Sequence, residues 1–359
     1  MKIDLIAGAR PNFMKIAPII EAMRKAQKDG EDINFRLIHT GQHYDSNMSD
    51  VFFNQLGMNQ PDYKLQLGGG NHGEQTGKMM IEIEKIVVNE MPQAIVVYGD
   101  TNSTIAGALV ASKLHIPLFH IEAGLRSYNK KMPEEVNRIL TDHISNLLFV
   151  TSDIAIQNLK KEGIEDGIFL VGDLMKDLVL SVKKDNLIGK KMISDAYYYA
   201  TIHRPYNTDY PERLLKILNQ FNILDKKVLL ALHPRTNKLL TDYNIYKTDY
   251  SNIIFIDPQS YLSNLNYMIH SEGIITDSGG IQKEAYWIQK KCVTLRSETE
   301  WIETVALGGN SLLFEDISSL EFEINSKPSS WDEDLYGNGN CAEQIVQTIL
   351  KLNSFEKTS

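Results

Sequence analysis

Short apolar runs alternate with longer amphipathic stretches along the first half of the chain. The short runs are rich in Val, Ile and Leu without a polar alternation, which is typical of strands buried on both faces of a sheet. Between them, apolar residues recur at helical spacing. The pattern predicts strands at residues 3–8, 35–41, 94–100, 116–122 and 147–152, and helices at residues 15–26, 79–90, 103–114 and 137–146.

The same alternation resumes in the second half of the chain. Buried strands separated by helices predict a second parallel sheet, so the fold class is α/β with two doubly wound domains. We place the boundary between residues 167 and 168, within the stretch from Gly163 to Gly172. Strands are predicted at residues 196–203, 227–234, 252–257, 273–277, 291–296 and 310–315, and helices at residues 211–221, from 261, from 281 and from 341.

Composition adds limits to this picture. The chain has 359 residues with 43% hydrophobic positions, more than one hydrophobic core usually spans. A net charge of -9 argues against a mainly electrostatic grip on nucleic acid. Two cysteines without CxxC spacing, an N-terminus unlike a signal peptide and the lack of a membrane-spanning run indicate a cytoplasmic protein that does not associate with membranes.

Charged and polar residues gather where the predicted strands end. In open parallel sheets, ligands bind outside the carboxyl ends of the strands, so these residues are candidates for a ligand site. His39 and His43 have the spacing of a metal pair but flank a glycine in a loop, so no metal is predicted. The strand-end residues are Gly8, Arg10, His39, Gln42, His43, Gly99, Asp100, His120, Glu122, His203, His233, Asp277, Ser278, Gly279 and Gly280.

The stretch TDSGGIQKEA places Ser278, Gly279 and Gly280 at a helix start. Free backbone N–H groups and the helix dipole favour an anion there, and glycines let a diphosphate approach the backbone. A simple N-cap with a turn explains the same residues equally well. Arg10 and Lys15 follow the first strand, where either side chain can neutralise a phosphate.

Three acidic residues, Asp100, Glu122 and Glu134, lie at a strand end or at the start of the next helix. Helix capping and salt bridging account for them, because Asp100 precedes a helix and Pro133 begins one. Carboxylates directed at one cleft can instead act as general acid and base. Dehydrogenase, P-loop, serine hydrolase and zincin motifs are absent from the sequence, which removes those common readings.

The ordered motifs resemble a known family over nearly the whole chain. GARPNFMKIAP, HTGQHYD, YGDTNST, HIEAGLR, MPEEVNRILTDH, HPR, IDPQSYL, TDSGGIQKEA and YGNG look like the non-hydrolysing UDP-N-acetylglucosamine 2-epimerases. The resemblance implies a GT-B fold, with the active site in a cleft between two Rossmann-like domains. It implies that residues 341–353 pack back on domain 1–167, leaving domain 168–340 to bind UDP. It also implies a homodimer, a UDP-amino sugar substrate, and no metal or nicotinamide cofactor.

The family reaction is an anti elimination of UDP with loss of the C2 proton, followed by re-addition of UDP to the 2-acetamidoglucal on its other face. By matching motif positions, the resemblance implies that Asp100, Glu122 and Glu134 are the acid/base groups, without deciding which takes the C2 proton. It assigns stabilisation of the leaving UDP to Arg10, Lys15 and His203. The implied UDP-binding residues are Arg10, His233, Tyr261, Ser278, Gly279, Gly280 and Glu284, and Gln42 and His43 fall where some bacterial members bind an activating UDP-sugar.

Some residues depart from the family pattern. SETEWIE follows Arg296 where enzymes acting on UDP-N-acetylglucosamine tend to read TTERPE, and Tyr261 stands in for an aromatic that often stacks on uracil. These variants look more like the branch acting on modified sugars, such as UDP-2,3-diacetamido-2,3-dideoxy-glucuronate or 2,6-dideoxy amino sugars. A GT-B glycosyltransferase and an inert nucleotide-sugar sensor are the alternatives from other classes.

Overall fold

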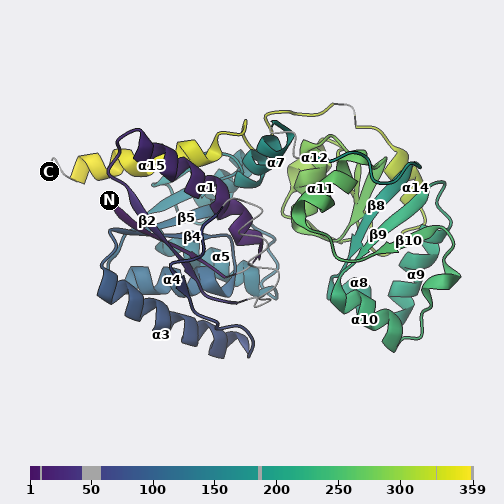
Figure 1. The fold of residues 1–359 in the computed structure, drawn as a ribbon, viewed down its shortest axis with the longest axis horizontal. Coiled ribbons are helices and arrows are strands. Elements are labelled where there is room, and N and C mark those ends of the chain that lie inside the picture. The colour runs from purple at the N-terminus through teal and green to yellow at the C-terminus, as the bar shows by residue number, and fades with distance from the viewer. Residues whose placement is uncertain (9, 43–57, 185–187, 329, 357–359) are drawn as a thin grey trace. The chain divides into compact units, whose positions relative to one another are not determined.

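Two all-parallel sheets form the framework of the chain, each inside its own compact unit (Figure 1). The structure is a computed structural model that describes residues 1–8, 10–42, 58–184, 188–328 and 330–356. The first unit contains Met1–Leu178 and Asp334–Ser359, and the second contains Val179–Glu333. The first unit extends beyond the boundary expected at residues 167 and 168, because strand β7 (Ile168–Leu170) pairs with its sheet.

The first sheet has seven strands in the order β3-β2-β1-β4-β5-β6-β7. The chain begins in the middle of the sheet, builds outward to one edge and then returns to build toward the other, which is the Rossmann arrangement. The reversal lies between β1 and β4. The remaining strands are β1 (Lys2–Ala7), β2 (Asn34–His39), β3 (Tyr63–Lys64), β4 (Ala94–Tyr98), β5 (Leu118–Ala123) and β6 (Leu147–Val150).

Helices cover both faces of this sheet (Figure 1). On one face, α3 and α4 enclose a core that includes Met79, Ile95, Val97 and Ala106. On the other face α1 contacts α15, which joins this unit from the far end of the sequence. The helices are α1 (Arg10–Lys28), α3 (His72–Glu90), α4 (Asn102–Lys113), α5 (Pro133–Ile144), α6 (Asp153–Lys161), α7 (Leu174–Lys184) and α15 (Cys341–Glu356).

The second sheet repeats the same arrangement with six strands, in the order β10-β9-β8-β11-β12-β13. Its core includes Leu214, Phe221 and Leu230. The strands are β8 (Tyr197–Ile202), β9 (Lys227–Leu232), β10 (Ile253–Ile256), β11 (Gly273–Thr276), β12 (Cys292–Thr294) and β13 (Asn310–Leu312). The helices are α8 (Pro205–Thr208), α9 (Pro211–Asn222), α10 (Pro234–Asp242), a 3₁₀ turn (Lys247–Asp249), α11 (Tyr261–His270), α12 (Gly279–Trp287), α13 (Ile302–Ala306) and α14 (Leu320–Asn325).

Two Rossmann-ordered parallel sheets confirm the predicted α/β fold class. Over the part of the chain that the structure describes, no helix is both long and apolar enough to cross a membrane. The same residues contain no group of three or more His, Cys, Asp and Glu side chains arranged to hold a metal ion.

Near the points where the chain passes between the two units, the carboxylate of Asp177 connects α7 with the start of α15. Asp177, on α7, accepts hydrogen bonds from the backbone N–H groups of Cys341 at 3.2 Å and Ala342 at 2.8 Å, at the start of α15. Lys176 donates to the carbonyl of Leu335 at 3.2 Å and also to that of Gly337. Burial raises the pKa of Asp177 to about 6, although the two N–H groups partly offset this.

This raised pKa predicts an unusual pH dependence of stability. The folded state binds the Asp177 proton more tightly than the unfolded state, whose carboxyl has an ordinary pKa of 3.8. Wild-type stability relative to Asp177→Asn should therefore increase by about 2 kcal/mol as the pH falls from about 7 to about 4.5. Calorimetric melting of both proteins across this range measures the difference. The exposed Asp242→Asn variant is the control, and a gap between wild type and Asp177→Asn that does not change with pH contradicts the prediction.

Candidate active site

Glu122 occupies the end of β5 in a conformation that few residues other than glycine adopt. Its φ is 69°, in the left-handed region, and the pairing of β5 with β6 shifts register between Ile121 and Ala123. Such a backbone costs about 1 kcal/mol or more and persists only where the surroundings hold it. The bulge re-aims the carboxylate at the strand end, where it forms an ion pair with Lys15 of α1.

The Lys15–Glu122 pair is almost enclosed by protein. The two side chains are only 11% and 10% exposed. A methyl group added to Gly99, which follows β4, would lie 3.2 Å from Glu122 Oε2 and 3.4 Å from Lys15 Nζ. The ends of β4 and β5 and the first turns of α1 therefore meet at one point. Because each charge neutralises the other, the pair can remain ionised at a site with little water.

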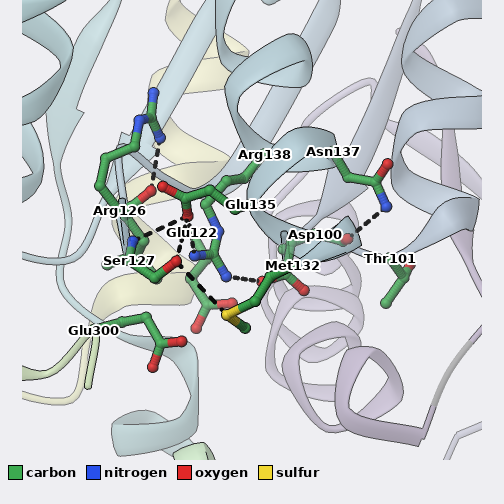
Figure 2. A network of polar contacts seen from close by, with 12 residues as sticks. Asp100, Thr101, Glu122, Arg126, Ser127, Met132, Glu135, Asn137, Arg138 and Glu300 are labelled. Atoms are coloured by element: carbon green, nitrogen blue, oxygen red, sulfur yellow. Dashed lines mark hydrogen bonds and ion pairs between the residues drawn. The ribbon is translucent and has the colours of Figure 1, made fainter. Parts of the chain in front are cut away.

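Asp100, one residue beyond Gly99, is held by a second cation (Figure 2). Arg138 of α5 places one guanidinium nitrogen on Asp100 and the other on Glu135, at 2.8 Å. Glu135 is fully buried and also accepts hydrogen bonds from the backbone N–H groups of Ser127 and Tyr128. Arg138 therefore pairs with the Asp100 carboxylate and, through Glu135, links it to the loop that follows β5.

The capping interpretation of Asp100 is not what the structure shows. Thr101 is the N-cap of α4 and forms a capping box with Thr104, so the Asp100 carboxylate is left for Arg138. The salt-bridge interpretation does hold for both Asp100 and Glu122. Pairing with a cation keeps a carboxylate ionised, which suits either a base or an electrostatic stabiliser.

Glu134 differs from the other two acids. It lies in the first turn of α5, directly after Pro133, as the sequence predicted. Four residues separate it from Arg138, so the two share one face of the helix, which is the face that reaches Asp100. Among the described residues no hydrogen bond or ion pair is recorded for the Glu134 side chain, which is partly exposed. Of the three acids, Glu134 is thus the one that forms no ion pair with the side chains that the structure describes.

In the second unit, His203 is oriented by the buried Asp277. His203 follows β8, and its ring Nδ1 lies 3.1 Å from Asp277 Oδ1. The same carboxylate accepts hydrogen bonds from the backbone N–H groups of His203 and Arg204 and from the Asn207 amide. Although burial opposes ionisation, these donors hold the pKa of Asp277 below its ordinary value. The ring therefore donates through Nδ1 and presents Nε2 outward.

His233 lies beside His203, with the ring centroids 5.7 Å apart. It is the N-cap of α10, where its Nδ1 accepts a hydrogen bond from the backbone N–H of Arg235 at 3.2 Å. Loss of solvation, the neighbouring His203 and Arg235 all lower the pKa of His233. The imidazole is therefore neutral and carries its proton on Nε2, which makes it a hydrogen-bond donor rather than a charge.

The start of α12 has the features of an anion site. Ser278 is its N-cap residue by position, yet its hydroxyl makes no capping hydrogen bond, and Gly279 and Gly280 form the first turn. A methyl group on Gly280 would meet nothing within 4 Å, and one on Gly279 would meet only Arg296 and Trp301, each at 3.8 Å. Neither glycine has a positive φ. Because neither packing nor backbone conformation requires glycine here, close approach of a ligand is the remaining physical reason for both.

The other predicted UDP-binding residues in this unit are buried. Glu284 lies further along α12 and is 5% exposed, while Tyr261, the first residue of α11, is 4% exposed. Burial leaves only a small part of the Tyr261 ring open to a base. The uracil-stacking role of Tyr261 stays a prediction.

Two of the predicted residues cannot be compared with the structure. The side chain of Arg10 and the whole of His43 lie outside the described residues. Gln42 is described, and its amide oxygen accepts hydrogen bonds from the Ser103 N–H at 2.9 Å and the Ser103 hydroxyl at 2.7 Å. Gln42 therefore binds the first turn of α4, and its predicted contact with an activating UDP-sugar stays a prediction.

Several partners of the predicted residues were missed by sequence reasoning. Arg138 and Glu135 belong to a quoted motif, but the role of Arg138 depends on Asp100, 38 residues away in the sequence. Asp277 was a strand-end candidate, but its contact with His203 was not predicted. The one available signal was the charge balance, because two acids at adjacent strand ends require nearby cations. That requirement points to Arg138 but does not single it out from the other basic residues.

Two parallel sheets of Rossmann order, with ionised acids at the strand ends of one and an open helix start in the other, define a two-domain protein of the GT-B type. The family model described as UDP-N-acetylglucosamine 2-epimerase matches residues 25–350. The chain belongs to this family. The resemblance predicted from the motifs is confirmed.

Relatives match along their whole lengths. A UDP-N-acetylglucosamine 2-epimerase homolog of Methanococcus maripaludis is 45% identical over 98% of this chain and 100% of its own. A UDP-2,3-diacetamido-2,3-dideoxy-D-glucuronate 2-epimerase of Pseudomonas aeruginosa is 44% identical with the same coverage. The crystal structure of Methanocaldococcus jannaschii UDP-GlcNAc 2-epimerase in complex with UDP-GlcNAc and UDP matches with a TM-score of 0.89 at 42% identity, covering 97% of this chain and 99% of that one.

The enclosed ion pair predicts a large cost for removing either partner. Lys15→Met and Glu122→Gln should each lower the free energy of unfolding by about 3 kcal/mol, because each breaks an enclosed ion pair. The double variant should cost less than the sum of the two. Urea unfolding of the four proteins measures the coupling. The exposed Lys78–Glu74 pair on α3 is the control, where the same changes should alter stability little. Strict additivity at Lys15 and Glu122 would show that the pair does not form.

Proposed function

We propose that this chain is a non-hydrolysing UDP-amino-sugar 2-epimerase, an isomerase that inverts C2 of UDP-N-acetylglucosamine to give UDP-N-acetylmannosamine. The reaction removes the C2 proton and breaks the bond from C1 to UDP, giving a 2-acetamidoglucal beside UDP. Re-addition of UDP and return of a proton to the other face of C2 complete the inversion. The observation that carries this proposal is the meeting of Asp100, Glu122 and the start of α5 at the ends of β4 and β5.

The charge pairing in the first unit suits the proton transfers. A base for a weakly acidic C–H must be ionised, and Asp100 and Glu122 each pair with a cation, Arg138 and Lys15 respectively. Glu134 lies in the first turn of α5, one helical turn before Arg138, and pairs with none of the described cations, so a proton transfer at Glu134 would break no ion pair among them. Three acids in different charge environments can divide the work of an acid and a base on opposite faces of C2.

The second unit has the groups that suit a departing diphosphate. The N–H groups of Gly279 and Gly280 and the Ser278 hydroxyl can donate to phosphate oxygens at the positive end of the α12 dipole. His203 offers Nε2 from a ring fixed by Asp277. Donors held in place before the reaction stabilise charge as it develops, which is where such groups contribute most. Arg10 and His233 are proposed as further UDP contacts, with Glu284 on the ribose.

The sugar is proposed from the relatives and remains open to one alternative. Relatives of nearly equal identity are named for UDP-N-acetylglucosamine and for UDP-2,3-diacetamido-2,3-dideoxy-D-glucuronate. The same C2 inversion on the diacetamido glucuronate, or on a 2,6-dideoxy amino sugar, is the alternative. We further propose that the protein acts as a homodimer in the cytoplasm, without a metal or nicotinamide cofactor, in the synthesis of a cell-envelope polysaccharide. An activating UDP-sugar near Gln42 and His43 is part of the same proposal.

Proton NMR in D2O tests the reaction. The purified chain is incubated with UDP-N-acetylglucosamine and, in parallel, with the diacetamido glucuronate analogue. Deuterium at C2 together with a manno-configured UDP-sugar is the expected result in one of the tubes, because the C2 proton passes through a residue that exchanges with solvent. The responding tube identifies the substrate.

Variants of the three acids test the assignment in the same assay. Asp100→Asn, Glu122→Gln and Glu134→Gln should each slow exchange at least ~100-fold, a usual magnitude for a positioned acid or base. Near-normal exchange rates in all three variants would contradict the assignment of these acids as the acid/base groups. If UDP binds but neither sugar exchanges, a glycosyltransferase or sensor explains the chain better.

The space around Gly280 at the start of α12 predicts that a methyl group added there will weaken UDP binding without destabilising the fold. Gly280→Ala should leave the melting temperature unchanged, because the methyl meets no protein atom. It should weaken UDP binding at least tenfold, an order-of-magnitude estimate for blocking phosphate approach to the backbone. Calorimetric titration with UDP measures this. Gly73→Ala, also in the first turn of a helix with nothing within 4 Å, is the matched control and should bind UDP normally. Equal affinity in both variants would refute the site.

A further inference from the structure

His120, Asp142 and Arg126 form a buried cluster of charges directly beneath the ends of β4 and β5. All three belong to the quoted motifs, but the proposed reaction gives none of them a role. His120 and Asp142 are no more than 1% exposed, and Arg126 is 6% exposed. Asp142 lies in the last turn of α5, where the negative end of the helix dipole disfavours a carboxylate. The cluster therefore needs its own explanation.

The hydrogen bonds of His120 fix its protonation. Its Nδ1 lies 2.7 Å from Asp142 Oδ1, and its Nε2 lies 2.8 Å from the carbonyl oxygen of Gly99. A carboxylate and a carbonyl can only accept, so both ring nitrogens must donate and the ring carries a positive charge. Asp142 also accepts from Arg126 at 2.7 Å. Although burial opposes its ionisation, these two cations hold the pKa of Asp142 below its ordinary value.

The bonds of the cluster end on the backbone beside the two paired acids. His120 holds the carbonyl of Gly99, the residue immediately before Asp100. Asp142 holds the N–H of Gly124 at 3.1 Å, two residues after Glu122. Both glycines have a positive φ, 62° and 77°, and both lie where the regular strand pairing has ended or shifted. The Gly99 N–H still donates to the Ile121 carbonyl at 2.9 Å, but the Gly99 carbonyl and the Gly124 N–H bond to the cluster instead of to a neighbouring strand.

We propose that His120 and Asp142 are positioning residues for the epimerisation, which fix Asp100 through Gly99 and Glu122 through Gly124. The inference rests on the proposed function for its catalytic consequence. Neither side chain touches the sugar. They act by fixing the positions of the two carboxylates relative to each other at the ends of the neighbouring strands β4 and β5. A displacement of about 1 Å at such a site can cost ~100-fold in rate.

The outer part of the cluster has a different task. Arg126 continues to Glu162 through two hydrogen bonds of 2.7 Å, and Glu162 lies 3.4 Å from His143 near the surface. Burial opposes the charge of Arg126, yet Glu162 and Asp142 raise its pKa above the ordinary value. This part balances the charge of Asp142 without touching Gly99 or Gly124, so it offers a matched control.

Two near-isosteric variants separate the two bonds of His120. In His120→Gln the amide nitrogen can take the place of Nε2 and still donate to Gly99, whereas in His120→Asn it takes the place of Nδ1 and reaches only Asp142. We expect kcat for C2 epimerisation to fall about 10- to 100-fold in His120→Asn and in Asp142→Asn, with KM within about threefold. His120→Gln should lose less. Glu162→Gln should keep at least a third of the wild-type kcat.

A purely structural role gives a different result. In that case the loss of kcat in His120→Gln and in His120→Asn would be proportional to the decrease in melting temperature. The same proportionality would hold for Glu162→Gln. If the positioning role holds, calorimetric UDP titration of each variant should match wild type, because none of the proposed UDP contacts belongs to the cluster. Activity that tracks melting temperature, or equal kcat in the two His120 variants, overturns the proposal.

Long-range proton–nitrogen NMR of the His120 ring tests the cluster independently of activity. Two protonated ring nitrogens are expected in the wild-type chain at neutral pH, and loss of the Nδ1 proton signal is expected in Asp142→Asn. If only one ring nitrogen of His120 is protonated, the proposed hydrogen bonds of the cluster are wrong, independently of the measured activity. A doubly protonated ring in a chain that epimerises neither sugar would instead count against the proposed function alone.

Discussion

The placement of negative charge at the ends of β4 and β5 constrains everything around the candidate site. An acid with little exposure must be paired or it loses its charge, since solvation is no longer available. Lys15 from α1 and Arg138 from α5 meet this need for Glu122 and Asp100. Because each cation comes from a helix beside the strands, the ion pairs also join α1 and α5 to the strand ends. Packing and electrostatics are thus a single constraint in this part of the fold.

The two units use different physical means for their parts of the proposed reaction. The first relies on side-chain charges that are neutralised in pairs, so that two carboxylates can be held at a poorly hydrated site before any proton is transferred. The second relies on backbone N–H groups, a helix dipole and a histidine aligned by Asp277. Dipoles bind an anion without a permanent full charge, so the same groups can also release it. That difference fits a reaction in which UDP must leave C1 and then return to it.

The sheets and their order followed from periodicity, because buried parallel strands are nearly continuous apolar runs. Strand-end chemistry was also predictable, since Asp100, Glu122, His203 and Ser278 directly follow predicted strands. What each side chain contacts was not. Glu122 adopts a left-handed φ that no local sequence rule demands, and its Lys15 partner is more than a hundred residues away. Thr101 rather than Asp100 caps α4, because the helix begins one residue later than capping by Asp100 would require. Such outcomes depend on tertiary contacts, which a sequence pattern does not contain.

The last helix gives the first unit an order of assembly. α15 contacts α1 and buries Ile345 and Ile349 completely, but the ribosome makes it only after the whole second unit. Until then, the nascent first unit exposes the apolar surface of α1 that α15 will cover, and Asp177 lacks the two N–H groups that it holds in the finished protein. The second unit, made from one continuous segment, has no such wait. The first unit is therefore made first but can be completed only after the second unit has been synthesised.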